Sequence, residues 1–221
     1  MHPKAKTIVL FHDDHLTPGE EVAAISAIEL FIKSIGLDGI LKFNNAGNWY
    51  FSGRPHESLA WYLAKAYQPM LRDSQLNATT IIRDIANSPH REDVPNYPVI
   101  VTEFDIYDEA YEESEIGGIA SEGVGTVIST YRTRASNHPN TNCFQLARVI
   151  IHELGHVFGM CNPKRAPQRL VQAGGHHCSN TCAMRQVLRP GEGLLITRDM
   201  LNSDGKPFCD DCLKDLFLFF A

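Results

Sequence analysis

The sequence predicts an α+β fold, on the strength of three observations. In the first half of the chain, β-rich apolar runs alternate with amphipathic segments of helical period. A helix that is apolar on nearly every side, VIIHELGHVFGM at 149–160, follows the last predicted strand. A cysteine-rich tail then begins near residue 160. We therefore expect an N-terminal subdomain over 1–160 and a smaller C-terminal subdomain over 161–221.

The clearest helix start is at Thr17, where an N-cap residue precedes Pro18 and two acidic residues, and this helix is expected to end at Gly36. Further helices are predicted over 56–72, 78–88 and the H-E-x-x-H segment, with Asn142 as the N-cap of the last. Strands are predicted over 6–12, 39–43, 49–52 and 97–108, and as a pair around Glu122 and Gly123 within 117–134. We interpret HDDH at 12–15 as a strand end before a helix cap, in preference to a metal cluster.

Composition limits the function. The chain has 221 residues, 43% of them hydrophobic and 21% charged, which is typical of one globular domain with a small appendage. Its net charge of -6 argues against a nucleic-acid partner. No apolar run approaches the length of a membrane span, and the N-terminal apolar run lacks a signal-peptide cleavage site. We therefore expect a cytoplasmic monomer.

The segment His152-Glu153-Leu154-Gly155-His156 carries the most informative pattern. Residues i and i+4 of a helix lie one turn apart on the same face, so His152 and His156 can offer two imidazoles to one metal ion. Glu153 follows His152 directly, where its carboxylate can reach a water on that metal. Buried histidines and a buried glutamate also need polar partners, and a metal is one. The pattern predicts a catalytic zinc site with Glu153 as general base.

The cysteines suggest a second metal site. Four of them form close pairs, C-x3-C at 178–182 and C-x2-C at 209–212. In a reducing compartment such pairs are more often metal ligands than disulfides, although two disulfides remain the alternative. We expect Cys161 to be a buried thiol and Cys143 to be structural; ligation of the catalytic metal by Cys161 would close a site that must stay open.

A catalytic zinc needs a third protein ligand. Gly159 extends the pattern to H-E-x-x-H-x-x-G, which resembles the metzincin family of zinc peptidases, but Asn162 occupies the position of that family's third histidine. Further on, His177 directly precedes Cys178, and Cys182-Ala183-Met184 follows. This order resembles the archaemetzincin branch, with an insertion over 160–176 before the third histidine. The first cysteine pair is one residue closer than the usual spacing of that branch.

Upstream segments resemble the same family more loosely. VTEFD at 101–105 is similar to its T-x-x-D strand, and GGIASEGVGTVISTYR at 117–132 is similar to its glycine-rich hairpin. The resemblance implies a metzincin-like twisted mixed sheet with packed helices, including the active-site helix, and a small C-terminal zinc-binding subdomain. It implies two zinc ions, one catalytic and one structural. The ligands it implies are His152, His156 and His177 for the catalytic zinc, and Cys178, Cys182, Cys209 and Cys212 for the structural zinc. Met184 would form the Met-turn, an apolar floor beneath the histidines.

Two functions stay open at this point. The first is a zinc metallopeptidase in which a zinc-bound water, activated by Glu153, hydrolyses a peptide or protein substrate. We expect that substrate to lie along GTVISTYR, 125–132, as an edge strand. The second is a catalytically inactive, metal-stabilised module that binds a peptide or protein, suggested by the displaced third histidine. His176 is the alternative third ligand, disfavoured because His177 alone adjoins a cysteine.

Overall fold

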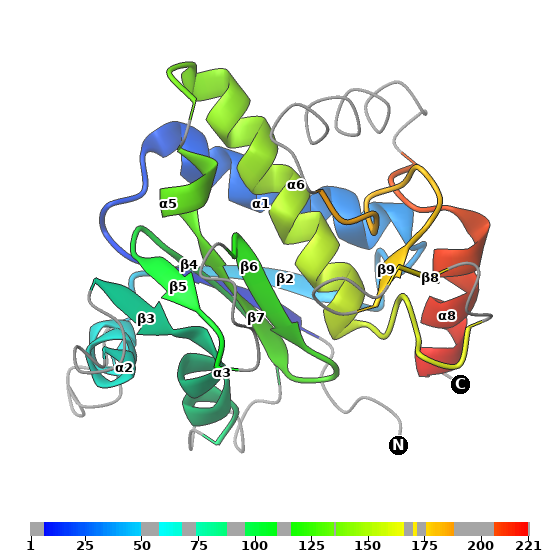
Figure 1. The fold of residues 1–221 in the computed structure, drawn as a ribbon, viewed down its shortest axis with the longest axis horizontal. Helices are drawn as coiled ribbons and strands as arrows, with labels where there is room; N and C mark the ends of the chain where they lie inside the picture. Colours follow the sequence, from blue (N-terminus) through cyan, green and yellow to red (C-terminus); the bar gives the residue numbers. More distant parts are fainter. Residues whose placement is uncertain are drawn as a thin grey trace.

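The fold is centred on a five-stranded sheet of order β2-β1-β4-β7-β6 (Figure 1). The computed structural model describes residues 7–49, 58–67, 74–87, 96–109, 116–134, 136–165, 170–171, 176–187 and 206–220. The strands of this sheet are β1 (Thr7–His12), β2 (Lys42–Gly47), β4 (Tyr97–Thr102), β6 (Gly118–Ser121) and β7 (Gly125–Ser129). Strands β1, β2, β4 and β7 run parallel to one another, and β6 runs antiparallel to β7. The sheet is therefore mixed and mostly parallel, which confirms the predicted fold class.

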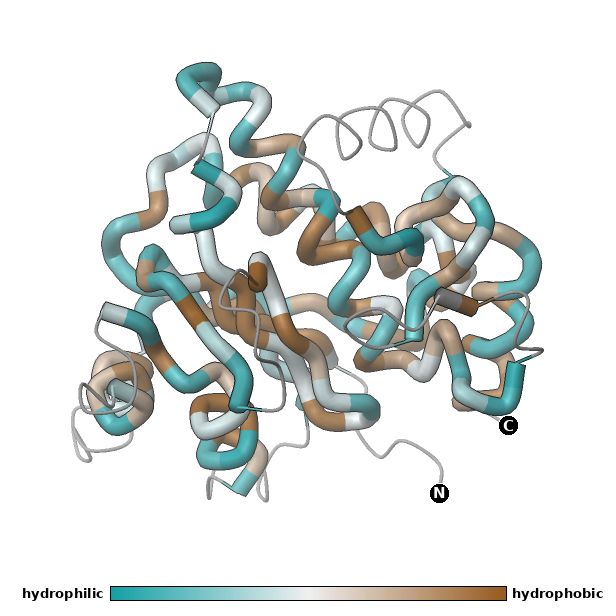
Figure 2. The backbone as a smooth tube through the Cα atoms, viewed as in Figure 1, coloured by the Kyte–Doolittle hydropathy of each residue, from teal (hydrophilic) through white to brown (hydrophobic). Residues whose placement is uncertain are grey.

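Helices cover both faces of this sheet (Figure 1). On one face lie α1 (Pro18–Ser34) and α6 (Pro139–Val157), and on the other lie α2 (Leu59–Ala66) and α3 (Ala78–Ala86). Alternation along β1 explains the two cores, because Ile8 and Leu10 pack toward the first pair of helices, and Val9 and Phe11 toward the second. Figure 2 shows hydrophobic residues concentrated in these strands.

The remaining elements are short apart from α8, and β8, β9 and α8 follow α6 in the chain. They are β3 (Gln75–Asn77), β5 (Asp105–Tyr107), α5 (Thr130–Thr133), β8 (Leu170–Val171), β9 (His177–Cys178) and α8 (Asp210–Phe220). The main core joins residues from both sides of residue 160, among them Leu154, Met184 and Leu216. The predicted subdomain boundary at this position therefore crosses a shared core, and the division itself stays a prediction.

The start of α1 was predicted correctly. Thr17 forms a capping box, in which its hydroxyl accepts from the Glu20 backbone N–H and the Glu20 carboxylate accepts from the Thr17 N–H. Pro18 occupies the first turn, and the chain leaves the helix at Gly36, whose φ of 69° suits glycine. The local signals agree with the structure because each acts within a few residues.

Two predicted boundaries were wrong. Asn142 is inside α6; the helix begins at Pro139 with His138 as N-cap, and the Asn142 side chain instead bonds the backbone of Ser136. The predicted strand 97–108 breaks into β4 and β5, because Asp13 accepts hydrogen bonds from the Thr102 hydroxyl (2.9 Å) and the Glu103 N–H (2.8 Å). These bonds also give the HDDH segment its structural role.

Other boundaries differ in length. The strand predicted over 39–43 is seen as β2, residues 42–47. Of the strand predicted over 49–52, residue 49 is not in a strand and residues 50–52 lie outside the described part of the chain. The helix predicted over 56–72 is seen as α2, residues 59–66, with 68–73 outside the described residues. Within the described ranges, no helix is long and apolar enough to span a bilayer.

The edge strand was also assigned wrongly. We predicted GTVISTYR, 125–132, as the edge, but β7 lies between β4 and β6, and the segment after Ser129 turns into the short helix α5. The edge strand beside α6 is β6. Strand order is a long-range property, so the alternation pattern of these residues could not reveal it.

Candidate active site and metal centres

Helix α6 brings His152 and His156 together. Their Nε2 atoms lie 3.2 Å apart, and their rings cross at 77°. His152 is 8% exposed and His156 is partly buried, so the pair is largely shielded from solvent. In a tetrahedral site with Zn–N bonds of 2.0–2.1 Å, two ligand nitrogens would be about 3.3 Å apart. The spacing of this pair therefore fits one shared zinc ion.

A second contact fixes the tautomer of His152. Its Nδ1 lies 2.7 Å from the carbonyl oxygen of Ala183, which can only accept a hydrogen bond. Nδ1 must therefore carry the proton, and Nε2 presents its lone pair toward His156. An imidazole held by a backbone carbonyl in this way has the ring orientation and basicity of a metal ligand.

His177 on β9 completes the histidine cluster. Its ring stacks on that of His152 at 5.1 Å between centroids and meets that of His156 at 5.3 Å. One ligand nitrogen from each of the three residues lies within 4.8 Å of the others. His176 is not a member of this cluster, although it is close enough to influence His156 electrostatically. Of the two neighbouring histidines, His177 and not His176 therefore forms a cluster with His152 and His156 of α6.

Burial keeps the two helical histidines neutral. It lowers the pKa of His156 to about 3, and the neighbouring His177 acts in the same direction. Burial also holds the pKa of His152 well below its ordinary value, with further contributions from His156 and Arg148. Neutral imidazole is the form that binds metal, so the site is prepared for a cation at physiological pH.

Glu153 adjoins this cluster and is buried, with 8% of its surface exposed. Burial raises the pKa of its carboxyl group to about 8, while the charge of Arg148 partly opposes the shift. The carboxylate packs against the edge strand: a Cβ atom placed on Gly118 would lie 2.8 Å from Glu153 Cγ and 3.1 Å from Oε1. The absence of a side chain at Gly118 therefore gives the carboxylate its place between α6 and β6.

Met184 lies beneath the histidines, fully buried. A Cβ on Gly155 would lie 2.1 Å from its sulfur, so the glycine inside H-E-x-x-H lets the methionine approach the helix backbone. The turn is tied down by hydrogen bonds from the Cys178 N–H to the Met184 carbonyl (2.9 Å) and from the Ala183 N–H to the Pro207 carbonyl (2.7 Å). Met184 therefore packs against the helix backbone at Gly155, and its role as a Met-turn stays a prediction.

The chain turns sharply after α6, as the glycine there indicated. Gly159 has a φ of 73°, and the Met160 N–H bonds the Gly155 carbonyl at 2.9 Å, closing the helix end. Asn162 does not belong to the histidine cluster; its N–H donates to Asp215 on α8 and its side-chain oxygen accepts from the Lys164 N–H. The third imidazole arrives instead from β9.

The four paired cysteines form a second cluster. Their sulfurs lie within 4.8 Å of one another, with separations of 3.7 Å for Cys178–Cys209, 3.9 Å for Cys182–Cys212 and 3.6 Å for Cys209–Cys212. Zn–S bonds of about 2.3 Å in a tetrahedron would place sulfurs about 3.8 Å apart. A disulfide would require about 2.05 Å, and all four thiols are free. The spacing fits a zinc tetrathiolate and disagrees with two disulfides.

The two remaining cysteines, Cys143 and Cys161, belong to neither cluster, and their structural roles stay predictions. Cys161 is buried, and it is not a member of the histidine cluster. Cys143, in α6, packs near Gly19 of α1, and burial raises the pKa of its thiol. Sequence reasoning overlooked Arg165, whose guanidinium reaches the cysteine cluster. A single arginine within the insertion gives no local signal of such a contact, because its partners lie 13 and 47 positions away in the sequence.

No family model matches the chain. An archaemetzincin from Nanoarchaeum equitans is 27% identical over 114 residues, or 51% of this chain and 47% of that protein, so the match spans about half of the relative. Two crystal structures of archaemetzincins share the fold. That from Methanopyrus kandleri has a TM-score of 0.63 at 17% identity, covering 97% of this chain and 95% of its own.

The second, from Archaeoglobus fulgidus and complexed with malonate, has a TM-score of 0.57 at 22% identity, covering 95% and 99% of the two chains. A zinc-dependent peptidase from Methanocorpusculum labreanum has a TM-score of 0.52 at 17% identity, with the same coverage. The likeness to these structures establishes the fold, and together with the sequence match it confirms the predicted resemblance.

Proposed function

We propose that this archaemetzincin-like chain is a zinc metallopeptidase, with its catalytic zinc held by His152, His156 and His177. The observation that carries the proposal is the cluster of three imidazole nitrogens within 4.8 Å, directly beside the buried Glu153. Three histidine ligands leave a fourth position open, which is the arrangement of catalytic and not of structural zinc sites. The peptidase named among the structures of this fold supports the same reading.

Bound zinc would supply a Lewis acid that polarises the peptide carbonyl and lowers the pKa of water in the site. The protein supplies the proton transfers. Glu153 takes a proton from the attacking water and returns it to the departing amine. Burial of Glu153 raises the pKa of its carboxyl group toward the range in which the group can both accept a proton and return it. Ala183 holds His152 in the ligand tautomer through its carbonyl.

We further propose that the peptide substrate adds to β6. This strand pairs with β7 on one side, and in the described part of the chain no other strand pairs with its free edge. Gly118 is the first residue of β6 and lies against the carboxylate of Glu153. A peptide that pairs with this edge would therefore pass the catalytic base. Backbone hydrogen bonds along such an edge bind extended peptides with little dependence on sequence.

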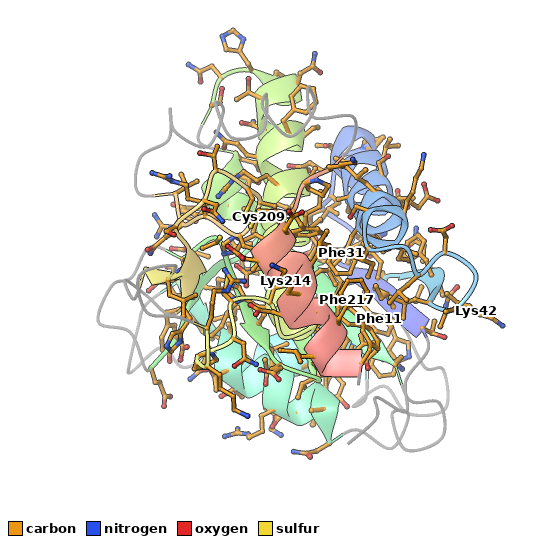
Figure 3. The ribbon with its side chains drawn as sticks, turned by 90° about the vertical axis from the view of Figure 1, so that its right-hand side faces the viewer. Phe11, Phe31, Lys42, Cys209, Lys214 and Phe217 are labelled. Carbon is orange, nitrogen blue, oxygen red and sulfur yellow. The ribbon has the colours of Figure 1, made fainter. Side chains whose placement is uncertain are left out.

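The four-cysteine cluster is proposed to hold a second, structural zinc. Cys178 and Cys182 precede Met184 in the chain, whereas Cys209 directly precedes α8 and Cys212 lies in its first turn (Figure 3, where Cys209, Lys214 and Phe217 mark that helix). A closed tetrathiolate site would join these two segments and fix the position of His177, the residue before Cys178. Two zinc ions per chain follow from this assignment.

A metal-stabilised binding module is the second candidate, favoured by the insertion that displaces the third histidine. A buried carboxylate beside the cluster argues against it, because a structural site has no need of a base. The cytoplasmic location and the monomeric state stay predictions.

The test is Glu153→Ala, with the exposed Glu122→Ala as matched control. Cleavage of a peptide library should fall by about a hundredfold or more, the effect of losing a general base, while elemental analysis finds both zinc ions retained. Cleavage at the parent rate would exclude Glu153 as the base. Absence of cleavage in the parent protein itself would favour the binding module.

A further inference from the structure

Arg165 lies in the insertion between Gly159 and His177, yet its side chain enters the four-cysteine cluster. Nη1 donates to Cys178 Sγ at 3.3 Å, and Nη2 donates to Cys212 Sγ at 3.4 Å. These sulfurs belong to different arms of the cluster, one on β9 and the other on α8. One guanidinium therefore bridges the two segments that the cysteines bring together.

Asp215 holds the guanidinium in place. Its Oδ2 accepts from Arg165 Nε at 3.0 Å and also from Nη2, and it accepts from the Asn162 backbone N–H at 3.0 Å. The arginine and aspartate side chains are only 6% and 9% exposed. A buried pair of this kind has little freedom to move, so the two donors stay aimed at sulfur.

The charge of the cluster explains the need for such a donor. Four thiolates around one divalent zinc carry a formal net charge of about −2 in a largely buried site. Uncompensated buried charge is unfavourable, and a fixed cation with N–H donors offsets it. A sulfur lone pair that accepts a charged hydrogen bond is also less available to an electrophile or a competing proton. Removing the donor should therefore make the thiolates more reactive and the metal easier to lose.

We propose that Arg165 is a positioning residue of the four-cysteine centre: it stabilises the thiolates of Cys178 and Cys212, slows loss of the metal and anchors the start of the insertion to the occupied site. The inference rests on the proposed structural zinc. It assigns the insertion a role at the second metal centre, separate from the catalytic residues. The adjacent Lys164 is exposed, and in the described part of the chain no hydrogen bond joins its side chain to the cysteines.

The experiment uses the full chain, purified without added metal, and measures transfer of zinc to a chromophoric chelator. Arg165→Met should speed release of one of the two zinc ions by about tenfold or more, the size expected when charged hydrogen bonds are lost. Arg165→Lys keeps the charge with fewer directed donors, so its rate should fall between those of parent and Arg165→Met. Lys164→Met is the matched control and should release zinc at the parent rate.

A maleimide provides a residue-specific readout, because its double bond adds to thiolate sulfur. In Arg165→Met, early labelling should rise at Cys178 and Cys212 and less at Cys182, as followed by peptide mapping. General loosening would raise labelling at all of these cysteines together and would overturn the proposal. Release at the parent rate in Arg165→Met would overturn it as well.

Two further outcomes separate this inference from the proposed zinc centre. If Arg165→Met does not fold because Asp215 is left unpaired, the double variant with Asp215→Asn removes that charge and should show the same faster release. Parent-like release from the folded double variant would refute the role of the guanidinium. If the parent chain contains no zinc beyond the histidine site, the structural zinc itself is refuted, whatever the variants show.

Discussion

Gly118→Ala tests the link between the edge strand and the catalytic base. The added Cβ would lie 2.8 Å from Cγ of Glu153 and 3.1 Å from both Cδ and Oε1. Contacts between carbon atoms are relaxed at about 3.5–4.0 Å, so the glutamate must shift by roughly 1 Å. Overpacking of this size costs about 1–3 kcal/mol, and a misplacement of about 1 Å can lower catalysis about a hundredfold.

The neighbouring glycine provides the matched control. A Cβ on Gly117 would meet Val149 at 3.7 Å, an ordinary contact, so Gly117→Ala should keep both stability and activity. The assay is kcat/KM for a cleaved peptide, with zinc content and thermal unfolding measured on the same samples. Gly118→Ala should keep its zinc, because His152 and His156 are not displaced, and lose about tenfold to a hundredfold in kcat/KM. Parent-like kcat/KM for Gly118→Ala, or equal losses in the two variants, would refute this reasoning.

Three other predictions concern the metal sites. By elemental analysis, His177→Ala should lose the catalytic zinc and keep the cysteine-bound zinc, whereas His176→Ala should keep both ions. The reverse result would show that His176, and not His177, is the third ligand. The parent should contain about two zinc ions per chain, and Cys209→Ser about one, as a count of ligand sets; a parent ratio near one that Cys209→Ser leaves unchanged would exclude the tetrathiolate site. In the metal-free protein, burial raises the pKa of Glu153 from 4.5 to about 8. The folded state then keeps a proton that the unfolded chain has lost, so the free energy of unfolding should fall as pH rises through this interval, by at most about 1.4 kcal/mol per pH unit. Urea unfolding between pH 6.5 and 8 should show a more negative slope in the parent than in Glu153→Gln, because the histidines of the unfolded chain, which still titrate near pH 6.5, contribute equally to both proteins. Equal slopes would contradict the buried proton.

Some features of the site could be predicted because they are local. His152 and His156 face one direction through the helical period alone, and Thr17 with Glu20 closes its capping box within one turn. Gly159 could be recognised as the end of the helix because a positive φ suits glycine. In each case the interacting residues are separated by a few positions, so their spacing determines the geometry.

Other features depended on how distant segments meet. The sequence by itself determined the α+β class, the histidine pair with its glutamate, and the cysteine pairs as candidate ligands. Only the tertiary structure decided that β6 and not β7 is the edge strand, that His177 and not His176 faces the helical pair, and that Arg165 reaches the cysteines. The physical reason is that strand order, chain return and buried ion pairs depend on contacts between residues far apart in sequence, which no local period or propensity encodes.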